Sequence, residues 1–161
     1  TDEVKNMVSL HGDAALRAQF EAVRTSVLTA PRDAAALKYE VVHMRERMRA
    51  ANLVQPDVFN LKYSRGGMVD IEFATQYIVL LHSQQYPQML ENRGNIALLA
   101  RADELGILHD QVGTQAAAAY RELRRLQHRA RLNEEGSDFP PDLVKSQADA
   151  GLALWKQVFG N

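Results

Sequence analysis

The stretch NLKYSRGGMVDIEFATQYIVLL, residues 60–81, decides the fold of this chain. It reads as a charged loop, then the pair Gly66 and Gly67, then a helix that is apolar over more than half of its circumference. The helix is predicted to run from Met68 to about residue 85, because Tyr86 and Pro87 follow there as a break. Charged residues and glycines crowd at the start of this helix, which suggests a loop that positions something anionic.

A helical wheel separates the two carboxylates of this stretch. At about 100° per residue, Asp70 falls in the middle of the apolar arc and Glu72 lies about 160° away, so the two do not share a face. Asp70 either stabilises the first turn of the helix, or pairs with an arginine of a neighbouring helix such as Arg45 or Arg49, or serves a site at a domain interface. Glu72 is expected to face outward more freely. The far side of the wheel also carries Thr75, Gln76, Val79, His82 and Ser83.

The glycine pair suggests a second role for the loop. Gly66 and Gly67 allow a tight turn, and with Lys62 and Arg65 beside them their backbone N–H groups predict an anion or phosphate cradle. The alternative is a loop-to-helix turn that carries two solvated cations. Neither the GxxxxGK[ST] phosphate loop nor the GxGxxG pattern is present.

Composition excludes several classes of function. The chain has 161 residues, a length that fits one domain, and a formal net charge of −1, so it carries no global basic footprint for nucleic acid. The absence of cysteine excludes disulfides, thiolate metal sites and a cysteine nucleophile. The five histidines have no metal-ligand spacing, and no apolar run approaches the roughly 20 residues that span a bilayer. The chain begins at Thr1 rather than Met, which suggests a piece of a longer protein.

The rest of the chain predicts helices throughout. Further helices are expected over residues 13–29, with Asp13 as the N-cap, and from Asp33 through the Met48 region, and these two are expected to form an antiparallel pair. Residues 52–67 are expected to form a loop, and helices follow over 92–105, 109–134 and from about 142 to the end. The predicted fold class is all-α, a bundle of five to six mostly antiparallel helices over residues 13–161, after a lead-in segment at 1–12.

Helical spacing also predicts which side chains point inward, with Arg45, Glu46 and Arg49 largely off the apolar stripe of their helix. The inward set is Leu16, Phe20, Val23, Val27, Leu37, Val41, Met44, Met48, Ile96, Leu99, Ala102, Val112, Ala116, Tyr120, Leu123, Ala130, Val144, Ala148, Leu152, Trp155 and Phe159.

The longest predicted helix carries a dense basic strip, Arg121, Arg124, Arg125, His128, Arg129 and Arg131. One interpretation is a solvated face with local pairing to Glu122 and Glu134. The other is a docking strip for an acidic protein surface or a nucleic-acid backbone. Aromatic residues are sparse there, which argues against stacking of single-stranded bases.

The segment KYSRGGMVDIEF, residues 62–73, resembles the K-x(n)-G-G-x-x-D-I-E-F signature of the glutamine synthetase adenylyltransferase/adenylyl-removing enzyme family. The segments DAALRAQFEAVRTSVLTAPRD, AALKYEVVHMRERMRA, DIEFATQYIVLLHS and LWKQVFGN are also similar to the last part of such enzymes. The closing tryptophan segment and the wording DIEF-ATQY favour the C-terminal, adenylylating half. The motif carries over to Lys62, Gly66, Gly67, Asp70, Ile71, Glu72 and Phe73, while Arg65 occupies a variable position.

The resemblance implies a division of labour. In this family a nucleotidyltransferase domain with a G-S-x-x-D-x-D type motif holds the metal-binding carboxylates, and a helical domain follows it. No such motif exists in this chain, so the resemblance implies the helical domain alone, inactive in isolation, with no catalytic or metal-binding residue and no bound cofactor. The candidate nucleotide or interface residues are Lys62, Gly66, Gly67, Asp70 and Glu72, with the glycine loop expected to face the missing domain.

For the parent enzyme, the resemblance implies transfer of AMP from ATP, with Mg²⁺, to a tyrosine of glutamine synthetase, and removal of AMP by phosphorolysis. Its implied partners are the nucleotidyltransferase domain, glutamine synthetase and a PII-type signal protein, with glutamine as an effector, in the cytoplasm, without nucleic acid or membrane. The alternative is a noncatalytic interaction module that docks an acidic partner through Arg121, Arg124, Arg125 and Arg129.

Overall fold

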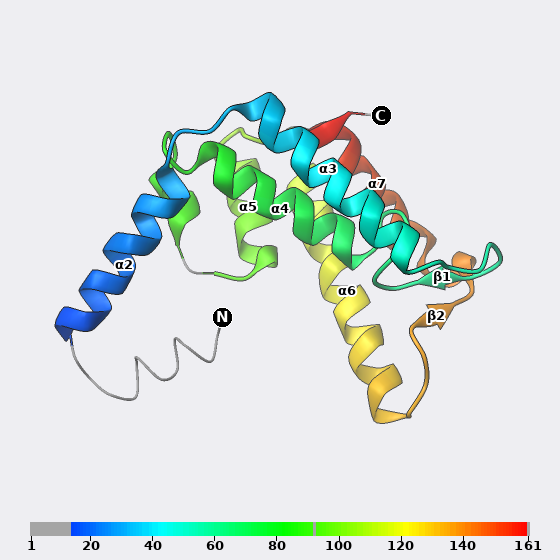
Figure 1. Ribbon diagram of the computed structural model, residues 1–161. Helices are drawn as coiled ribbons and strands as arrows, with labels where there is room; N and C mark the ends of the chain where they lie inside the picture. The colour runs from blue at the N-terminus through cyan, green and yellow to red at the C-terminus, as the bar shows by residue number, and fades with distance from the viewer. Residues whose placement is uncertain (1–13, 92, 161) are drawn as a thin grey trace.

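The structure, a computed structural model, describes residues 14–91 and 93–160. The described chain is built mainly from helices: α2 (Ala14–Thr29), α3 (Ala34–Ala51), α4 (Met68–His82), α5 (Asn95–Glu104), α6 (Val112–Leu132) and α7 (Lys145–Phe159), with the 3-10 helices η1 (Pro87–Leu90) and η2 (Pro141–Val144). The predicted all-α fold is confirmed (Figure 1). The predicted lead-in segment and the Asp13 cap lie outside the described residues.

Helix α4 is the centre of the domain. It contacts α3, α5, α6 and α7, and its residues Ile71 and Ala74 are fully buried. Because neighbours cover it on several sides, Thr75 and Ser83 are buried as well, although the wheel placed both on its far side. Each hydroxyl donates to the backbone carbonyl four residues earlier, so neither is left without a partner inside the core.

The inward faces of the later helices were predicted with mixed success. All five residues predicted to be inward on α6 are buried. On α7, Leu154 is fully buried while the predicted Leu152 is 41% exposed. On α3, the buried side chain is the charged Arg45, and the predicted Met44 is 48% exposed.

The predicted antiparallel pairing of the first two helices is wrong. Helix α2 projects from the body and packs against α4 near its own C-terminal end instead of lying along α3 (Figure 1). Its apolar residues Leu16, Val23 and Val27 are 48%, 64% and 58% exposed. The turn between the helices is held open by Arg32, whose guanidinium donates to the carbonyls of residues 27, 28 and 30 at 2.6–3.2 Å.

A two-stranded ribbon interrupts the loop over residues 52–67. Strand β1 (Phe59–Asn60) pairs antiparallel with β2 (Asp138–Phe139), so the loop is tied to the segment between α6 and α7. The side chain of Asn60 donates to Asp138 Oδ1 at 2.8 Å and supports the pairing. These strands were not predicted, because strands this short show no alternating run of β-branched residues in the sequence.

The start of α6 is capped by a residue of α5. The carboxylate of Asp103 accepts hydrogen bonds from the backbone N–H groups of Gly113 and Thr114 at 3.0 and 2.6 Å, and from the Thr114 hydroxyl at 2.8 Å. Asp103 therefore caps α6 from a neighbouring helix, ten residues upstream of the first amide that it binds. This contact fixes the start of the helix that carries the basic strip.

Candidate functional site

Asp70 anchors α4 to α3. It is 2% exposed, its Oδ1 accepts from the Nε of the fully buried Arg45, and its Oδ2 accepts from the backbone N–H of Gly66 at 2.7 Å. Arg45 also donates through Nη2 to the Tyr63 carbonyl at 2.8 Å. Of the alternatives predicted for Asp70, the pairing with an arginine of a neighbouring helix is confirmed, and the partner is Arg45. This carboxylate is fully used within the fold.

Both glycines are tightly packed, Gly66 against α7 and Gly67 within the loop. Gly66 has a φ of +79°, and a side chain there would overlap the carbonyl of Ala148. A side chain on Gly67 would lie 2.9 Å from the carbonyl oxygens of Leu61 and Ser64. Gly66 therefore permits a close approach between the loop and α7, and Gly67 permits the tight turn within the loop itself. The expected orientation of the glycine loop toward another domain stays a prediction.

The backbone N–H groups at this turn are occupied. The amides of residues 66–69 donate in order to Asp70 Oδ2, Ser64 O, Leu61 O and Lys62 O, at 2.7–3.1 Å. An anion placed at the start of α4 finds none of these four donors free. The predicted backbone cradle is therefore not formed by these amides, because the loop folds its own acceptors onto them.

A groove lies on the other side of the same loop, and we call it the basic groove. It has a volume of about 500 Å³ and lies between the loop, the start of α4, the start of α5 and the middle of α6. Its polar lining includes Lys62, Glu72, Asn95, Tyr120, Arg124 and Arg131. Two of the predicted candidates, Lys62 and Glu72, are thus brought together, whereas Gly66, Gly67 and Asp70 are buried away from it.

Glu72 faces α6 and not open solvent. Its Oε1 accepts a hydrogen bond of 2.8 Å from the hydroxyl of Tyr120, and the residue is half-buried. Burial, together with the adjacent Glu72 carboxylate, raises the pKa of Tyr120 above its ordinary value of 10.0. The guanidinium of Arg124 lies 5.8 Å from the centroid of the Tyr120 ring, within cation–π range. The predicted separation of Asp70 and Glu72 onto different faces is confirmed.

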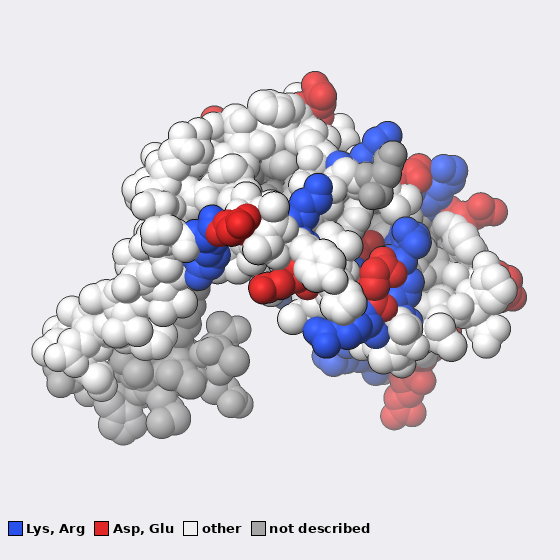
Figure 2. All heavy atoms as spheres, turned by 45° about the horizontal axis from the view of Figure 1, so that its top comes forward, with Lys and Arg blue, Asp and Glu red and all other residues white. Residues whose placement is uncertain are grey.

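The basic strip of α6 lies beside the groove. Arg121, Arg124, Arg125 and Arg129 are all exposed. The predicted pairing with Glu122 is formed by Arg125, through two hydrogen bonds of 2.9 and 2.6 Å, while no ion pair to Glu134 forms among the described residues. A second hollow of about 380 Å³ is lined along this strip and shares Arg124, Gln127 and Arg131 with the basic groove. Lysine and arginine side chains gather on the body away from α2 (Figure 2).

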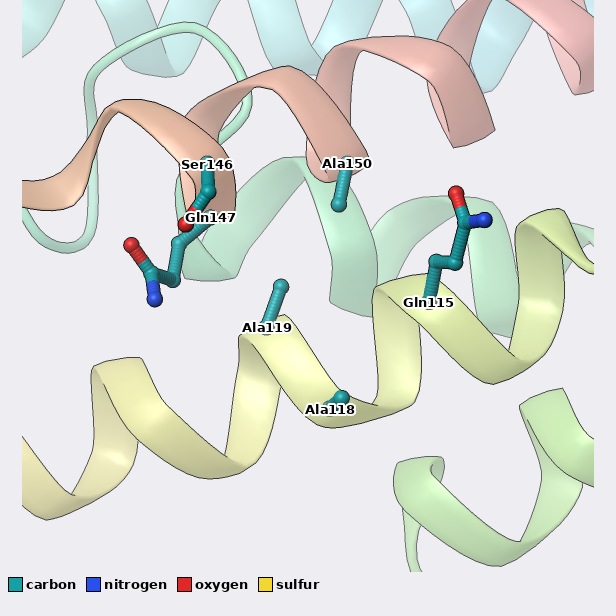
Figure 3. Close-up of a pocket in the computed structure, with 6 residues that line it drawn as sticks. All are labelled: Gln115, Ala118, Ala119, Ser146, Gln147 and Ala150. Carbon is teal, nitrogen blue, oxygen red and sulfur yellow. The ribbon is translucent and has the colours of Figure 1, made fainter.

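Two other hollows offer less chemistry. One, of about 370 Å³ between α6 and α7, is lined by glutamine, serine and alanine side chains (Figure 3). The other, of about 220 Å³ between α3 and α4, is mostly apolar. Across the described residues, no three His, Cys, Asp or Glu side chains gather in a way that could hold a metal ion. No helix of the described chain is both long and apolar enough to cross a membrane.

The groove was not predicted as a site, although the spacing of two of its arginines in the sequence is a partial sign of it. Tyr120 was assigned only to the core, and Arg124 only to a strip on the surface. Arg124 and Arg131 are seven residues apart, which places them on one face of a helix two turns apart. That face lies opposite Lys62 only because the fold brings the loop there, so spacing alone could not indicate the groove.

A sequence profile of the GlnD PII-uridylyltransferase family matches residues 35–138. The chain belongs to this family. The matched region holds every charged residue of the basic groove, together with Asp70 and Arg45. It therefore spans the loop, α4, α5 and α6, the four segments that position the groove.

Individual relatives carry a more specific name. A protein of Burkholderia mallei is 49% identical over 150 residues, which cover 92% of this chain, and one of Aromatoleum aromaticum is 47% identical over 93% of it. A third, from Chromobacterium violaceum, is 43% identical over 148 residues. Each is named a bifunctional glutamine synthetase adenylyltransferase/adenylyl-removing enzyme, which confirms the resemblance drawn from the DIEF segment. The chain spans 16% of the length of each of these relatives.

Proposed function

We propose that this chain is a helical domain of a glutamine synthetase adenylyltransferase/adenylyl-removing enzyme. In that role it supports transfer of AMP from ATP to a tyrosine of glutamine synthetase in the cytoplasm, and so takes part in the regulation of nitrogen assimilation. The observation that carries the proposal is the 49% identity over 92% of the chain to a relative of that name. The domain holds no complete catalytic centre in this proposal, and its contribution is to position groups of the parent enzyme.

The reaction needs carboxylates for Mg²⁺, and the described residues do not fit that need. No group of three His, Cys, Asp or Glu side chains forms in residues 14–91 or 93–160. Asp70, the carboxylate of the family motif, already binds Arg45 and Gly66. We therefore assign the metal-binding carboxylates to a nucleotidyltransferase domain of the parent protein. Phosphoryl-type transfer depends mainly on positioning and charge neutralisation, and a neighbouring helical domain can supply cations for both.

We further propose that the parent domain meets this chain on the side of Lys62 and Glu72. In this proposal the glycine pair shapes the loop, since Gly66 is buried against α7 and Gly67 is buried within the loop. Glutamine synthetase and a PII-type signal protein remain the proposed partners of the whole enzyme.

The test is an adenylylation assay with the full-length parent enzyme, glutamine synthetase, ATP and Mg²⁺, with AMP on the target tyrosine measured by mass spectrometry. Glu72→Gln is expected to lower the rate, because it changes the groove without removing the Asp70 anchor. The 161-residue chain alone is expected to transfer no AMP. Transfer by the isolated chain, or no transfer by the full enzyme, contradicts the proposal.

A second function is supported by one observation. Arg121 and Arg129 are exposed on α6 and form no ion pair among the described residues, so this face can dock an acidic protein surface. In that case, charge reversal at Arg121, Arg125 and Arg129 abolishes partner binding while adenylylation survives. Loss of adenylylation with partner binding intact favours the first proposal.

A further inference from the structure

We infer that the basic groove binds the polyphosphate part of a nucleoside triphosphate. The inference rests on the proposed function for the choice of nucleotide, but the preference of the groove for phosphate rests on its own residues. It assigns positioning roles to Arg124 and Arg131, which lie outside the DIEF motif, and it places Lys62 opposite them.

The charge of the groove is the first argument. Lys62, Arg124 and Arg131 contribute three positive charges and Glu72 one negative charge, a surplus of two. None of the three cations takes part in an ion pair among the described residues, whereas Arg49, Arg101 and Arg125 each have a glutamate partner. The chain as a whole has a net charge of −1, so this surplus is local. A concave surface that gathers unpaired cations attracts anions.

The spacing of the cations is the second argument. Arg124 and Arg131 lie on one face of α6, about 10 Å apart along the helix axis at 1.5 Å per residue. Lys62 comes from the loop on the opposite wall. Cations spread along the groove in this way suit a chain of phosphates, which can contact all three side chains. A volume of about 500 Å³ is also in the usual range for a small-molecule site.

The walls of the groove are held in place before any ligand arrives. Glu72 and Tyr120 fix each other through the 2.8 Å hydrogen bond, and Arg124 lies over the Tyr120 ring. The backbone N–H of Lys62 donates to Asn60 Oδ1 at 3.0 Å, and its carbonyl accepts from Val69. Fixed walls lower the ordering cost of binding. Glu72 adds an acceptor that suits the hydroxyl groups of a sugar, so a nucleotide fits better than free pyrophosphate.

The experiment is amide NMR of the 161-residue chain, titrated in Mg²⁺-free buffer with ATP, pyrophosphate, adenosine and a peptide of ten glutamates. ATP and pyrophosphate are expected to shift the same amides, in the loop around Lys62 and along α6, and adenosine is expected to shift none. Because the groove is open to solvent, the dissociation constant for ATP is expected to be on the order of 1 mM and to rise with salt.

Variants on the same helix decide whether the groove or only the charge of α6 binds. Lys62→Gln and Arg124→Gln are each expected to weaken ATP binding roughly fivefold. Arg121→Gln is the matched control, because Arg121 is an exposed arginine of α6 that lines the neighbouring hollow but not the groove. An equal loss in the Arg121 variant shows diffuse attraction and overturns the inference. Tighter binding of the glutamate peptide than of ATP assigns the surface to a protein partner and overturns it too.

The full enzyme separates this inference from the proposed function. Arg124→Gln is expected to raise the KM for ATP severalfold with little change in kcat. If the enzyme adenylylates glutamine synthetase with an unchanged KM for ATP in this variant, the groove inference fails and the proposed function stands. If the isolated chain binds ATP in the groove but the full enzyme transfers no AMP to glutamine synthetase, the proposed function fails and the groove remains.

Discussion

Replacing Asp70 by Asn tests how the domain is held together. Asp70 is 2% exposed and Arg45 is fully buried, so their ion pair is shielded from water. The substitution removes the negative charge and leaves the guanidinium inside the fold. An asparagine also has one acceptor oxygen where the aspartate has two, so in the present geometry either Arg45 or the Gly66 amide would face the NH2 group, which is a donor.

The expected cost is large. Removing one partner of a buried ion pair destabilises a protein by about 3–5 kcal/mol, because the remaining charge loses its compensation. Arg45 has few other hydrogen bonds to compensate, since its Nη1 is already buried without a hydrogen-bond partner. A loss of this size is a large share of the roughly 5–15 kcal/mol by which domains are stable. At about 2–4 °C per kcal/mol for a chain of this length, it lowers Tm by roughly 6–20 °C.

The assay is urea unfolding followed by circular dichroism, with Glu46→Gln as the control. Glu46 also pairs with an arginine, Arg49, at 3.1 Å, but at the exposed surface of the same helix, where such pairs contribute about 0–1 kcal/mol. The double variant with Arg45→Met and Asp70→Asn is expected to be more stable than the sum of the two single effects predicts, because it removes the buried charge. A cost below about 1 kcal/mol for Asp70→Asn refutes the assignment of Asp70 as the anchor.

Three further changes test other contacts. Gly151→Ala is expected to lower the free energy of unfolding by about 1–3 kcal/mol, since the new methyl group overlaps the backbone of Gly66, whereas Gly136→Ala meets nothing and is the urea-unfolding control. Asp103→Ala is expected to cost about 0.5–2 kcal/mol and to speed hydrogen exchange of the first amides of α6, and unchanged exchange would exclude the cap. Burial lowers the pKa of His82 below 6.5, so the unfolded state takes up a proton first and stability is expected to fall as the pH drops below 6.5; an NMR titration of His82 at or above 6.5 contradicts this.

The sequence predicted most reliably those helices whose burial depends on apolar side chains. Every inward residue expected on α6 is buried, because its long stripe faces α5 and α7 along most of its length. At the C-terminal end, Val144 and Phe159 are buried as predicted and Ala148 and Trp155 pack against the core, but Leu152 is exposed and the buried Gly151, which lies against the backbone of Gly66, was missed. A hydrophobic pattern is read from apolar side chains, so it does not detect a glycine that is buried because it has no side chain.

The candidate site was harder to predict because its contacts join segments far apart in the chain. The pairing of Asp70 with an arginine of α3 was one of the alternatives predicted for it, since a carboxylate in an apolar arc requires a partner. The basic groove was not, because Tyr120 lies 48 residues after Glu72 and carries no local sign of its hydrogen bond. The exposure of α2 could not be predicted from the sequence either, because its apolar stripe resembles that of a buried helix. Its orientation depends instead on the turn that Arg32 stabilises.

The two carboxylates of the DIEF segment connect the anchor of the domain to its groove. Asp70 and Glu72 leave α4 about 160° apart, so one reaches α3 through Arg45 while the other reaches α6 through Tyr120. A rotation of α4 that moves one carboxylate must move the other. The buried ion pair therefore sets the orientation of Glu72 in the groove as well as contributing stability. This arrangement gives a physical reason for an aspartate and a glutamate two positions apart that never share a site.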